Sequence, residues 1–495
     1  MTLPPADGAS AFFDPDEDRL REECGVFGVF NADDAAVLTA LGLHALQHRG
    51  QEACGITAFD GRRFHNERHL GLVGDNFTGQ DLTARLPGQS AIGHVRYSTQ
   101  GATVLRNVQP LFADLNAGGF SLAHNGNLTN SRVLREELVR DGAIFQSTSD
   151  SEVILQLVAR SRAGKTIDRF IDAIRQIEGA YAMVALTNKK LIGVRDPLGI
   201  RPLVLGDLQG APVMASETCA LDMIGAKFVR DVEPGEVVVA TEDGIQSIKP
   251  FPPHRPRPCI FEFVYFARPD SIVDGRSVYE VRKEMGRKLA AEWPAEADVV
   301  IPVPDSGVPA ALGFAQASGI PFEHGIVRNH YVGRTFIQPS QQIRDMGVRL
   351  KHSANRGQIA GKRVVLIDDS VVRGTTSRKI VRMVREAGAS EVHFRSASPM
   401  IQWPDYYGID TPIRDKLIAA THTLEEMREE LNADSLGFLS VDGLYEAMGE
   451  EKGRDSEHPQ FTDHCFTGDY PTGLTDRTNA LEDKDRQLSF LHEVA

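Results

Sequence analysis

Short apolar runs alternate with polar and turn-forming residues over the first half of the chain. Such runs, bounded by Gly, Asn, Asp or Ser, are typical of strands. They predict strands at 24–30, 55–59, 91–94, 121–124, 180–186, 191–194 and 237–239. Apolar residues at helical spacing lie between them at 35–47, 131–141 and 151–160. Many short strands combined with a few helices indicate a layered α+β domain.

The second half of the chain follows a different pattern, in which apolar strands and helices alternate. A strand at 297–304 precedes a helix at 308–317, a strand at 363–367 precedes a helix at 376–387, and a strand at 391–396 follows. This alternation predicts an α/β domain with a mainly parallel, doubly wound sheet. The sequence TLEE at 423–426 has the pattern of a capping box and predicts a helix that ends near Asn432.

A proline-rich segment separates the two patterns. Residues 250–258 read PFPPHRPRP, with five prolines in nine positions, and such a segment can continue neither a helix nor a central strand. We therefore predict one domain at 24–257 and a second at 258–449. Residues 450–495 are polar and irregular, which predicts a surface-wrapping or partly mobile tail.

Composition narrows the classes of protein to consider. The 495 residues include 54 Lys+Arg and 68 Asp+Glu, a net charge of −14, which disfavours a general nucleic-acid binder because such proteins need a basic surface. Nowhere do 18 consecutive apolar residues occur, so we expect no membrane span. The start lacks the features of a secretory signal, and the five cysteines lack disulfide-framework spacing. A reducing, cytoplasmic location fits best.

The most informative motif is VVLIDDSVVRGTTS at 364–377. Two acids, Asp368 and Asp369, follow an apolar strand, at the edge where open α/β sheets bind ligands. Gly374 permits a tight turn, and the hydroxyl groups and helix N-terminus after it suit a phosphate. The candidate binding residues are Asp368, Asp369, Ser370, Arg373, Gly374, Thr375, Thr376 and Ser377. An acidic turn before an ordinary capped helix is the alternative, and the fourteen residues together argue against it.

This motif resembles the signature of the type I phosphoribosyltransferases. The resemblance implies that the two acids engage the ribose hydroxyls of phosphoribosyl pyrophosphate (PRPP) and that the GTTS loop holds its 5′-phosphate. VPDSG at 303–307 resembles the family's pyrophosphate loop. Ser306, with Asp368 and Asp369, matches the positions that contact Mg²⁺ and substrate, and Mg²⁺ prefers such hard oxygens.

A loop between these elements, at 328–340, resembles the family's mobile catalytic loop. Its matching residues are Tyr331, Gly333, Arg334 and Thr335. A polar loop of this kind could close over the reaction centre and exclude water. On composition alone, an ordinary surface loop is the alternative.

The first domain contains a second set of motifs. CGVFG at 24–28 is followed by HRGQE at 48–52, GHVRYST at 93–99, AHNGNL at 123–128 and STSDSE at 147–152. Each is weak alone, since a free cysteine is usually buried for structural reasons and Asn-Gly is usually a turn. In this order they resemble the N-terminal-nucleophile (Ntn) glutamine amidotransferase domain. The resemblance implies a four-layer αββα fold.

The same resemblance assigns roles. Cys24 matches the nucleophile, and an N-terminal cysteine carries its own base, an α-amine with a pKa of about 7.7–8.0. We therefore predict that residues 1–23 are a propeptide removed after Glu23. Asn125 and Gly126 match the oxyanion hole. The matches for glutamine binding are Arg49, Arg96, Thr99 and Asp150, with the role of Arg49 left open.

Together the two domains resemble the family of glutamine phosphoribosylpyrophosphate amidotransferases, or amidophosphoribosyltransferases. This implies formation of 5-phosphoribosylamine, glutamate and pyrophosphate from glutamine, PRPP and water, the first committed step of purine (IMP) biosynthesis. It also implies internal ammonia transfer, inhibition by purine nucleotides, and a homodimer or homotetramer. Alternatives are another amidotransferase, such as a glucosamine-phosphate synthase or asparagine synthetase, and a non-catalytic PRPP sensor. The motif at 364–377 argues against the first, and the amidotransferase motifs argue against the second.

One branch of this family holds a [4Fe–4S] cluster through four cysteines. Cys259 and Cys465 match the first and last ligand positions, whereas Asp405 and Thr462 stand at the second and third. Four-cysteine ligation is therefore impossible within this chain. We favour two buried thiols without a cluster. The alternative is a cluster with mixed ligands from Cys259, Asp405, His464 and Cys465.

Overall fold

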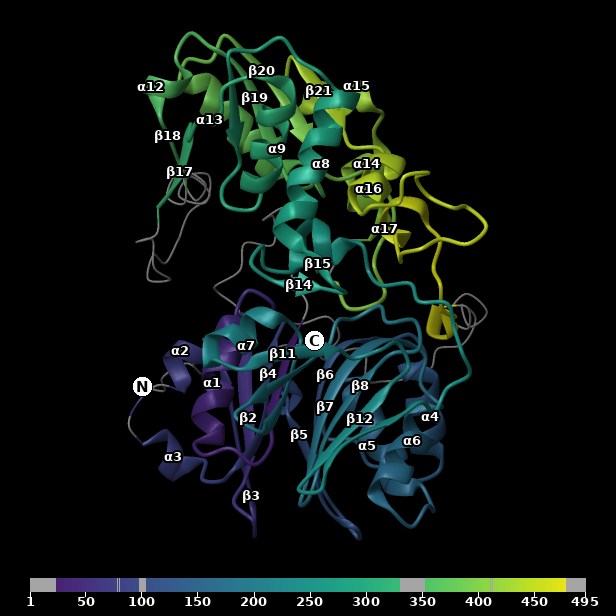
Figure 1. Ribbon diagram of the computed structural model, residues 1–495. Helices are drawn as coiled ribbons and strands as arrows, with labels where there is room; N and C mark the ends of the chain where they lie inside the picture. The colour runs from purple at the N-terminus through teal and green to yellow at the C-terminus, as the bar shows by residue number, and fades with distance from the viewer. Residues whose placement is uncertain are drawn as a thin grey trace, which may run out of the picture.

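The computed structural model describes residues 24–77, 79, 81–97, 104–329, 352–409, 411 and 413–477, which form two bodies stacked on each other (Figure 1). The lower body in Figure 1 contains the strands and helices of residues 24–257, and we call it the amidotransferase half after the family that its motifs resemble. The upper body contains the parallel sheet of the second domain, and we call it the transferase half. The predicted propeptide, Thr99 and the loop residues Tyr331, Gly333, Arg334 and Thr335 lie outside the described residues.

Two antiparallel sheets form the centre of the amidotransferase half. The first has the strand order β11-β9-β10-β1-β4-β2-β3 and the second the order β13-β12-β8-β7-β6-β5. The strands of the first sheet are β1 (Gly25–Val29), β2 (Ala53–Phe59), β3 (Phe64–Leu70), β4 (Ser90–Arg96), β9 (Val204–Leu208), β10 (Ala211–Ala215) and β11 (Lys227–Asp231). Those of the second are β5 (Leu111–Leu115), β6 (Gly118–Leu128), β7 (Gly179–Thr187), β8 (Leu191–Arg195), β12 (Val237–Thr241) and β13 (Gly244–Ile248).

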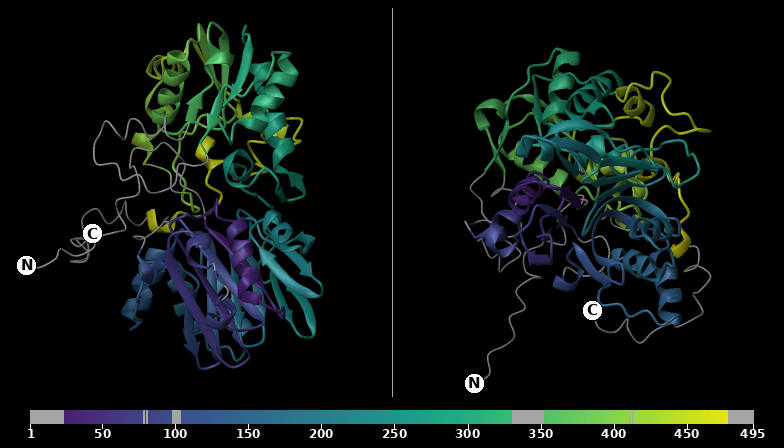
Figure 2. Two further views of the ribbon diagram at one scale, coloured as in Figure 1. Left: turned by 90° about the vertical axis from the view of Figure 1, so that its left-hand side faces the viewer. Right: turned by 60° about the horizontal axis from the view of Figure 1, so that its bottom comes forward.

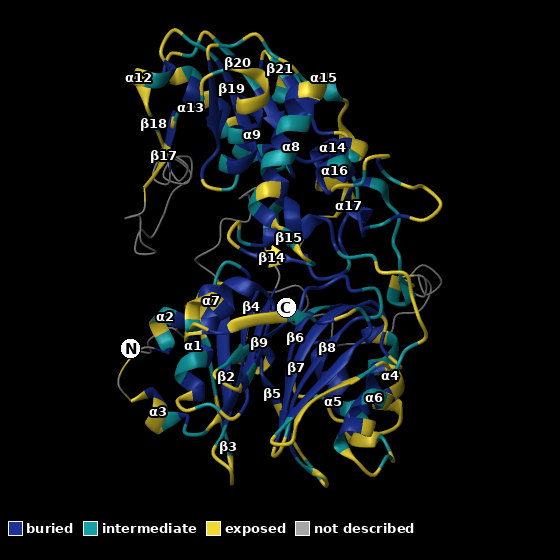
Figure 3. Ribbon diagram, viewed as in Figure 1, coloured by how far each residue is buried: buried dark blue, intermediate teal, exposed yellow. Residues whose placement is uncertain are grey.

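The two sheets pack face to face, with helices on their outer faces. Between the sheets lies a core that includes Val26, Ile92, Ala182 and Val238, so the central strands are buried on both sides and appear dark blue in Figure 3. Helices α1 (Ala35–Ala45) and α7 (Thr218–Ile224) pack on the first sheet, and α5 (Ser151–Arg160) and α6 (Thr166–Ile174) on the second, beside α4 (Ser131–Arg140). Shorter elements are α2 (Val73–Asn76), α3 (Leu82–Arg85) and η1 (Leu105–Asn107). The predicted αββα layers are confirmed.

A four-stranded parallel sheet forms the centre of the transferase half. Its order is β16-β19-β20-β21, with every neighbouring pair parallel. The strands are β16 (Val299–Pro302), β19 (Arg363–Asp368), β20 (Glu391–Ser396) and β21 (Ser435–Phe438). Alternate residues of β19 face opposite layers: Val365 packs with α8 and α9, and Leu366 packs with α13 and α15. The predicted mainly parallel sheet is confirmed.

Helices cover both faces of this sheet. The main helices are α8 (Val278–Glu292), α9 (Val308–Ser318), α13 (Thr375–Glu386), α15 (Leu424–Leu431) and α16 (Val441–Ala447). Helix α15 begins at the predicted capping box, in which Thr423 and Glu426 bond each other's backbone. The remaining elements are η2 (Glu262–Phe266), β14 (Ile272–Val273), β15 (Arg276–Ser277), β17 (Ile326–Arg328), β18 (His352–Ala354), α12 (Arg356–Ile359), η3 (Arg414–Lys416), α14 (Ile418–Thr421) and α17 (His464–Thr467).

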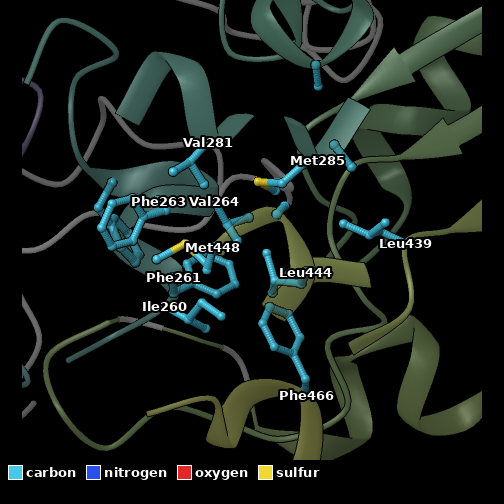
Figure 4. Packing of buried hydrophobic residues seen from close by; sticks show 14 of the residues in the cluster. Ile260, Phe261, Phe263, Val264, Val281, Met285, Leu439, Leu444, Met448 and Phe466 are labelled. Atoms are coloured by element: carbon cyan, nitrogen blue, oxygen red, sulfur yellow. The ribbon is translucent and has the colours of Figure 1, made fainter. Parts of the chain in front are cut away.

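The segment after residue 450 differs from the predicted surface tail. Phe461, Cys465 and Phe466 are buried in the core of the transferase half, and Figure 4 shows Phe466 beside Leu444 of α16, in a cluster that also includes side chains from η2 and α8. The polar residues among them misled the prediction because their polar groups bond one another. Asp463, for example, accepts hydrogen bonds from Tyr445 Oη at 2.9 Å and Arg454 Nε at 2.6 Å.

The chain joins the two bodies at more than one place. Residues 250–257 form neither helix nor strand, as predicted for a boundary. Farther along, the chain returns to the amidotransferase half, where Asp476 accepts hydrogen bonds from the backbone N–H groups of Arg132 at 2.9 Å and Val133 at 3.0 Å, in the first turn of α4. Figures 1 and 2 show this yellow segment beside α4. Among the described helices, none combines the length and the apolar character needed to cross a bilayer.

Candidate active sites

Cys24 lies immediately before β1 and is buried. Its Sγ lies 3.4 Å from the carbonyl oxygen of Tyr97. Burial raises the pKa of the Cys24 thiol to about 11, although Arg96 and the Tyr97 backbone act to lower it. The thiol is therefore protonated at neutral pH, and it needs a nearby base to become a nucleophile.

Asn125 and Gly126 lie next to each other in β6. The Asn125 side chain is fully buried, and neither its Oδ1 nor its Nδ2 has a hydrogen-bond partner within the described part of the chain. A buried carboxamide without partners is costly unless a ligand supplies them. Gly126 has a φ of 132°, and a Cβ there would lie 2.0 Å from the Ala180 carbonyl oxygen. Only glycine therefore fits this position. The Asn125 Nδ2 group and the Gly126 backbone N–H could both donate to a developing oxyanion.

The charge of Arg96 lowers the pKa of the Cys24 thiol and that of Asp150 raises it, which indicates that both groups lie near the thiol. Arg96, the last residue of β4, donates from Nη1 to the Asn107 carbonyl oxygen at 3.2 Å. Asn107 in turn accepts the Thr148 backbone N–H at 3.0 Å. Asp150 accepts the Leu128 N–H at 3.0 Å. A guanidinium and a carboxylate near one nucleophile could bind both charged groups of an amino acid.

Arg49 lies in the same region but has different partners. Its guanidinium is fully buried and pairs with Glu217 and, at 2.6 Å, with Glu262. Burial acts to lower the pKa of Arg49, but these two carboxylates raise it above its ordinary value. Glu262 also lies 3.5 Å from Arg201. This buried charge network joins the two bodies, and the geometry gives Arg49 a structural position within it.

The sequence interpretation did not include Glu217, Glu262 or Arg201. A signal was present at Glu262, because a lone acid interrupts the apolar run IFEFVYF at 260–266. A buried carboxylate needs a partner. The sequence gives no means of identifying that partner, because Arg49 lies 213 residues away.

The acidic motif lies in a cleft of about 470 Å³ at the carboxyl ends of β16 and β19. Six of the predicted residues line it: Ser306, Asp368, Asp369, Ser370, Thr376 and Ser377. Asp368 Oδ1 accepts the Asp369 N–H at 3.0 Å, and Asp369 Oδ1 accepts the Ser370 hydroxyl at 2.8 Å. Gly374, with a φ of 74°, turns the chain into α13, which begins at Thr375. These hydrogen bonds and this turn set the acids beside a helix N-terminus.

The cleft has further walls that the sequence interpretation missed. Basic side chains line it at Arg268, Arg282 and Arg328. Arg282 is held by the carbonyl oxygens of Phe263 and Ala267, each at 2.8 Å. Gln47, His48 and Gln51 of the amidotransferase half also line it. One cavity is therefore shared by both bodies.

Oxygen donors for a divalent cation gather in this cleft. The carboxylates of Asp368 and Asp369 and the hydroxyl of Ser306 are the hard ligands that Mg²⁺ prefers. The donor set therefore fits a divalent cation that also binds substrate phosphates.

A second group of candidate metal ligands lies in the transferase half. Asp405, His464 and Cys465 are buried, and one ligand atom of each lies within 4.8 Å of the others. Asp405 Oδ2 is hydrogen bonded to His464 Nε2 at 2.6 Å, and Thr462 donates its hydroxyl to the Arg257 carbonyl oxygen at 2.6 Å. The two non-cysteine positions are therefore engaged with protein groups. This donor set does not match a four-thiolate cluster.

The two cysteines of this region are both buried. Burial raises the pKa of the Cys259 thiol to about 12 and that of Cys465 well above its ordinary value. Without a metal ion nearby, both thiols are therefore protonated at neutral pH.

Comparisons with known proteins identify the family of each half. Residues 94–223 match the family described as glutamine amidotransferase domain, and residues 270–397 match the phosphoribosyl transferase domain. The amidophosphoribosyltransferase of Rhizobium etli is 63% identical over 96% of this chain and 97% of its own length. That of Bacillus subtilis is 49% identical over 92% of this chain and 95% of its own.

A solved structure has the same architecture. The glutamine PRPP amidotransferase of B. subtilis, complexed with ADP and GMP, is 48% identical, covers 91% of this chain and 98% of its own, and superimposes with a TM-score of 0.86. Identity this high over nearly the whole of both chains, together with the two sites, shows that the chain belongs to the amidophosphoribosyltransferase family.

Proposed function

We propose that this protein converts L-glutamine, PRPP and water into 5-phosphoribosylamine, glutamate and pyrophosphate, the first committed step of purine synthesis. The cleft lined by both bodies carries this proposal. Asp368 and Asp369 form one wall, and Gln47, His48 and Gln51 of the amidotransferase half form another. The PRPP cleft therefore borders the half that carries the glutamine site.

In the amidotransferase half, Cys24 attacks the side-chain amide of glutamine. Removal of residues 1–23 gives Cys24 a free α-amine, which takes the thiol proton. The raised pKa of the buried thiol supports this order of events, because the unprocessed chain has no such amine at Cys24. Ammonia leaves when the tetrahedral intermediate collapses to the thioester, and water then releases glutamate.

The surrounding residues bind and polarise glutamine. Arg96 pairs with its α-carboxylate, where a planar guanidinium suits two hydrogen bonds, and Asp150 accepts its α-ammonium. Asn125 Nδ2 and the Gly126 N–H donate to the oxyanion. The Asn125 carboxamide supports this role, because it is already buried before substrate arrives and has no hydrogen-bond partner among the described residues. Contacts of Thr99 and Arg49 with glutamine stay predictions.

In the transferase half, Asp368 and Asp369 accept hydrogen bonds from the ribose hydroxyls of PRPP. The hydroxyls and N–H groups of Thr375, Thr376 and Ser377 hold the 5′-phosphate at the N-terminus of α13. Ser306 and the two acids would hold Mg²⁺, which would offset the negative charge of the pyrophosphate leaving group. Ser370 and Arg373 complete the loop, and closure by Tyr331, Gly333, Arg334 and Thr335 stays a prediction.

Ammonia passes between the sites without release. In bulk water at neutral pH, ammonia is mostly protonated and is then no nucleophile, so a protected route preserves its reactivity. The shared cleft supports such a route.

We also propose that purine nucleotides inhibit the enzyme through the PRPP cleft, because they carry the same ribose and phosphate groups. The B. subtilis relative bound to ADP and GMP supports this proposal. A homodimer or homotetramer and a cytoplasmic location stay predictions.

The first test uses one purified sample. Intact mass and N-terminal sequencing define where the chain starts, and pyrophosphate release is then measured with glutamine and with ammonia. We expect a chain that begins at Cys24 and releases pyrophosphate with either donor. Activity with glutamine from a chain that retains residues 1–23 would contradict the proposed base. No PRPP-dependent activity with either donor would contradict the proposed reaction.

A further inference from the structure

We propose that Asp405, in the transferase half, is a positioning residue for the oxyanion strand of the amidotransferase half. Asp405 fixes the loop 405–409 against Gly126 and Asn127 of β6. The inference rests on the proposed role of Asn125 and Gly126 as oxyanion donors. It gives the buried Asp405–His464 pair a function that does not require a metal.

The Asp405 carboxylate organises its own loop. Its Oδ1 accepts two backbone N–H groups, from Tyr407 at 2.7 Å and from Ile409 at 2.8 Å. Its Oδ2 is hydrogen bonded to His464 at 2.6 Å, and His464 lies in α17 within the core. Hydrogen bonds to an ionised acceptor are stronger than neutral ones. The side chain is fully buried, so its bonds do not compete with water, and the loop has one defined conformation.

This loop contacts the strand that carries the oxyanion donors. The Tyr406 carbonyl oxygen accepts Asn127 Nδ2 at 2.9 Å. Gly408, with a φ of 126°, lies so close that a Cβ on it would be 3.1 Å from the Cα and carbonyl carbon of Gly126. Gly126 is also close to Ala180 of β7, whose carbonyl oxygen would be 2.0 Å from a Cβ on Gly126. The oxyanion strand is therefore packed tightly against its own sheet and against a loop of the other body.

The same loop is tied to the buried charge network. Arg201 Nη2 donates to the Tyr407 carbonyl oxygen at 2.8 Å, and Arg201 also lies 3.5 Å from Glu262. The loop is therefore held at three successive residues. Tyr406 bonds Asn127 and Tyr407 bonds Arg201. Gly408 packs against Gly126. Such a support matters because the Asn125 carboxamide has no hydrogen-bond partner in the described structure, so the position of this side chain depends on the strand that carries it.

Oxyanion donors work only when they are held at the correct place before the reaction begins. A displacement of about 1 Å in an active site can cost about 100-fold in rate. Loss of the Asp405 side chain leaves the N–H groups of Tyr407 and Ile409 without their acceptor, and the loop is then free to move away from Gly126. Glutamine binding uses Arg96 and Asp150, which this loop does not hold. The expected loss is therefore in kcat and not in KM.

The test compares variants of the complete two-domain enzyme after removal of residues 1–23. Asp405→Ala should lower kcat for glutamine-dependent pyrophosphate release by tenfold or more, with KM for glutamine and the ammonia-dependent rate within twofold of wild type. Asp405→Asn should restore most of kcat, because its Oδ1 can still accept both loop N–H groups. Asn127→Ala cuts the contact from the amidotransferase side and should reproduce the kcat loss.

Asp463→Ala is the matched control. Asp463 is an equally buried acid that precedes His464, the partner of Asp405, but it bonds Arg454 and Tyr445 and not the loop. This variant should destabilise the fold without separating the glutamine and ammonia activities. Alkylation of Cys24 by iodoacetamide, followed by peptide mass spectrometry, is a second control. It forms no oxyanion, so its rate should be unchanged in Asp405→Ala.

Two results would overturn the proposal. One is an unchanged kcat in both Asp405→Ala and Asn127→Ala. Another is a parallel loss of both activities in Asp405→Ala and Asp463→Ala, which is the behaviour of a purely structural residue. If Asp405→Ala does not fold, Asn127→Ala alone decides. The proposed function fails separately, when wild-type enzyme shows no PRPP-dependent activity.

Discussion

The buried charge network allows one substitution to be predicted with a magnitude. In Glu262→Gln, the shape of the side chain is kept and its charge is removed. That charge lies between two buried guanidinium groups, Arg49 at 2.6 Å and Arg201 at 3.5 Å, and the Glu262 side chain is 1% exposed. Removing one member of a buried ion pair costs about 3–5 kcal/mol, because the remaining charge has lost its compensation.

This cost is large compared with the total stability of a domain, which is about 5–15 kcal/mol. One kcal/mol shifts the melting temperature of a domain of 150–250 residues by about 2–4 °C. Glu262→Gln should therefore lower the midpoint of thermal unfolding by roughly 6–20 °C. Differential scanning calorimetry measures this shift directly.

Glu446→Gln provides the matched control. Glu446 pairs with Lys288 at 2.7 Å, but both side chains are about one-third exposed, and such a pair contributes at most about 1 kcal/mol. Its melting temperature should stay within a few degrees of wild type. A Glu262→Gln protein that melts within about 2 °C of wild type would refute the reasoning, because it would show that the network tolerates the loss of a buried charge.

Three further predictions concern the chemistry. Cys24→Ala should lower glutamine-dependent pyrophosphate release by roughly 10⁴-fold or more and leave the ammonia-dependent rate within about twofold; loss of both would contradict the separation of the two sites. Burial acts to raise the pKa of Glu217, but Arg49 and His48 hold it below the ordinary 4.5. The ionised Glu217 carboxylate therefore stabilises the folded protein fully above pH 4.5, and this contribution is lost as the pH falls. The difference in melting temperature between wild type and Glu217→Gln should shrink below pH 4.5, and a constant difference would contradict this sign. Anaerobically purified protein should contain only trace iron and acid-labile sulfide by elemental and colorimetric analysis. About four irons per chain would contradict the prediction that the protein binds no cluster.

Much of the fold could be predicted because its central strands are buried on both faces. Strands such as β7 and β19 form long apolar runs, and these are visible in the sequence. Three of the strands that were not predicted, β3, β11 and β13, are half-exposed or exposed edge strands with sequences such as FHNERHL and KFVRD. Backbone pairing with a neighbour stabilises them, and that pairing leaves little pattern in the side chains.

The sites divide in the same way. Residues within one contiguous motif, such as Asp368 and Thr376, were predicted because a strand end and a helix start bring them together locally. The network of Glu217 and Glu262 depends on contacts between bodies, and a single sequence does not reveal such pairings. The role of segment 461–466 in the core was missed because its polar groups are satisfied by partners far along the chain.

The contact of Asp476 with the first turn of α4 has a consequence for how this enzyme can be taken apart. Thr129 also bonds this segment, through the Gly473 carbonyl oxygen at 2.7 Å. A fragment that stops at the proline-rich segment would lose these contacts, and the exposed N–H groups of Arg132 and Val133 would lose their acceptor. The amidotransferase half is thus discontinuous in sequence. A chimera that exchanges it between relatives must transplant residues 473–477 together with 24–257.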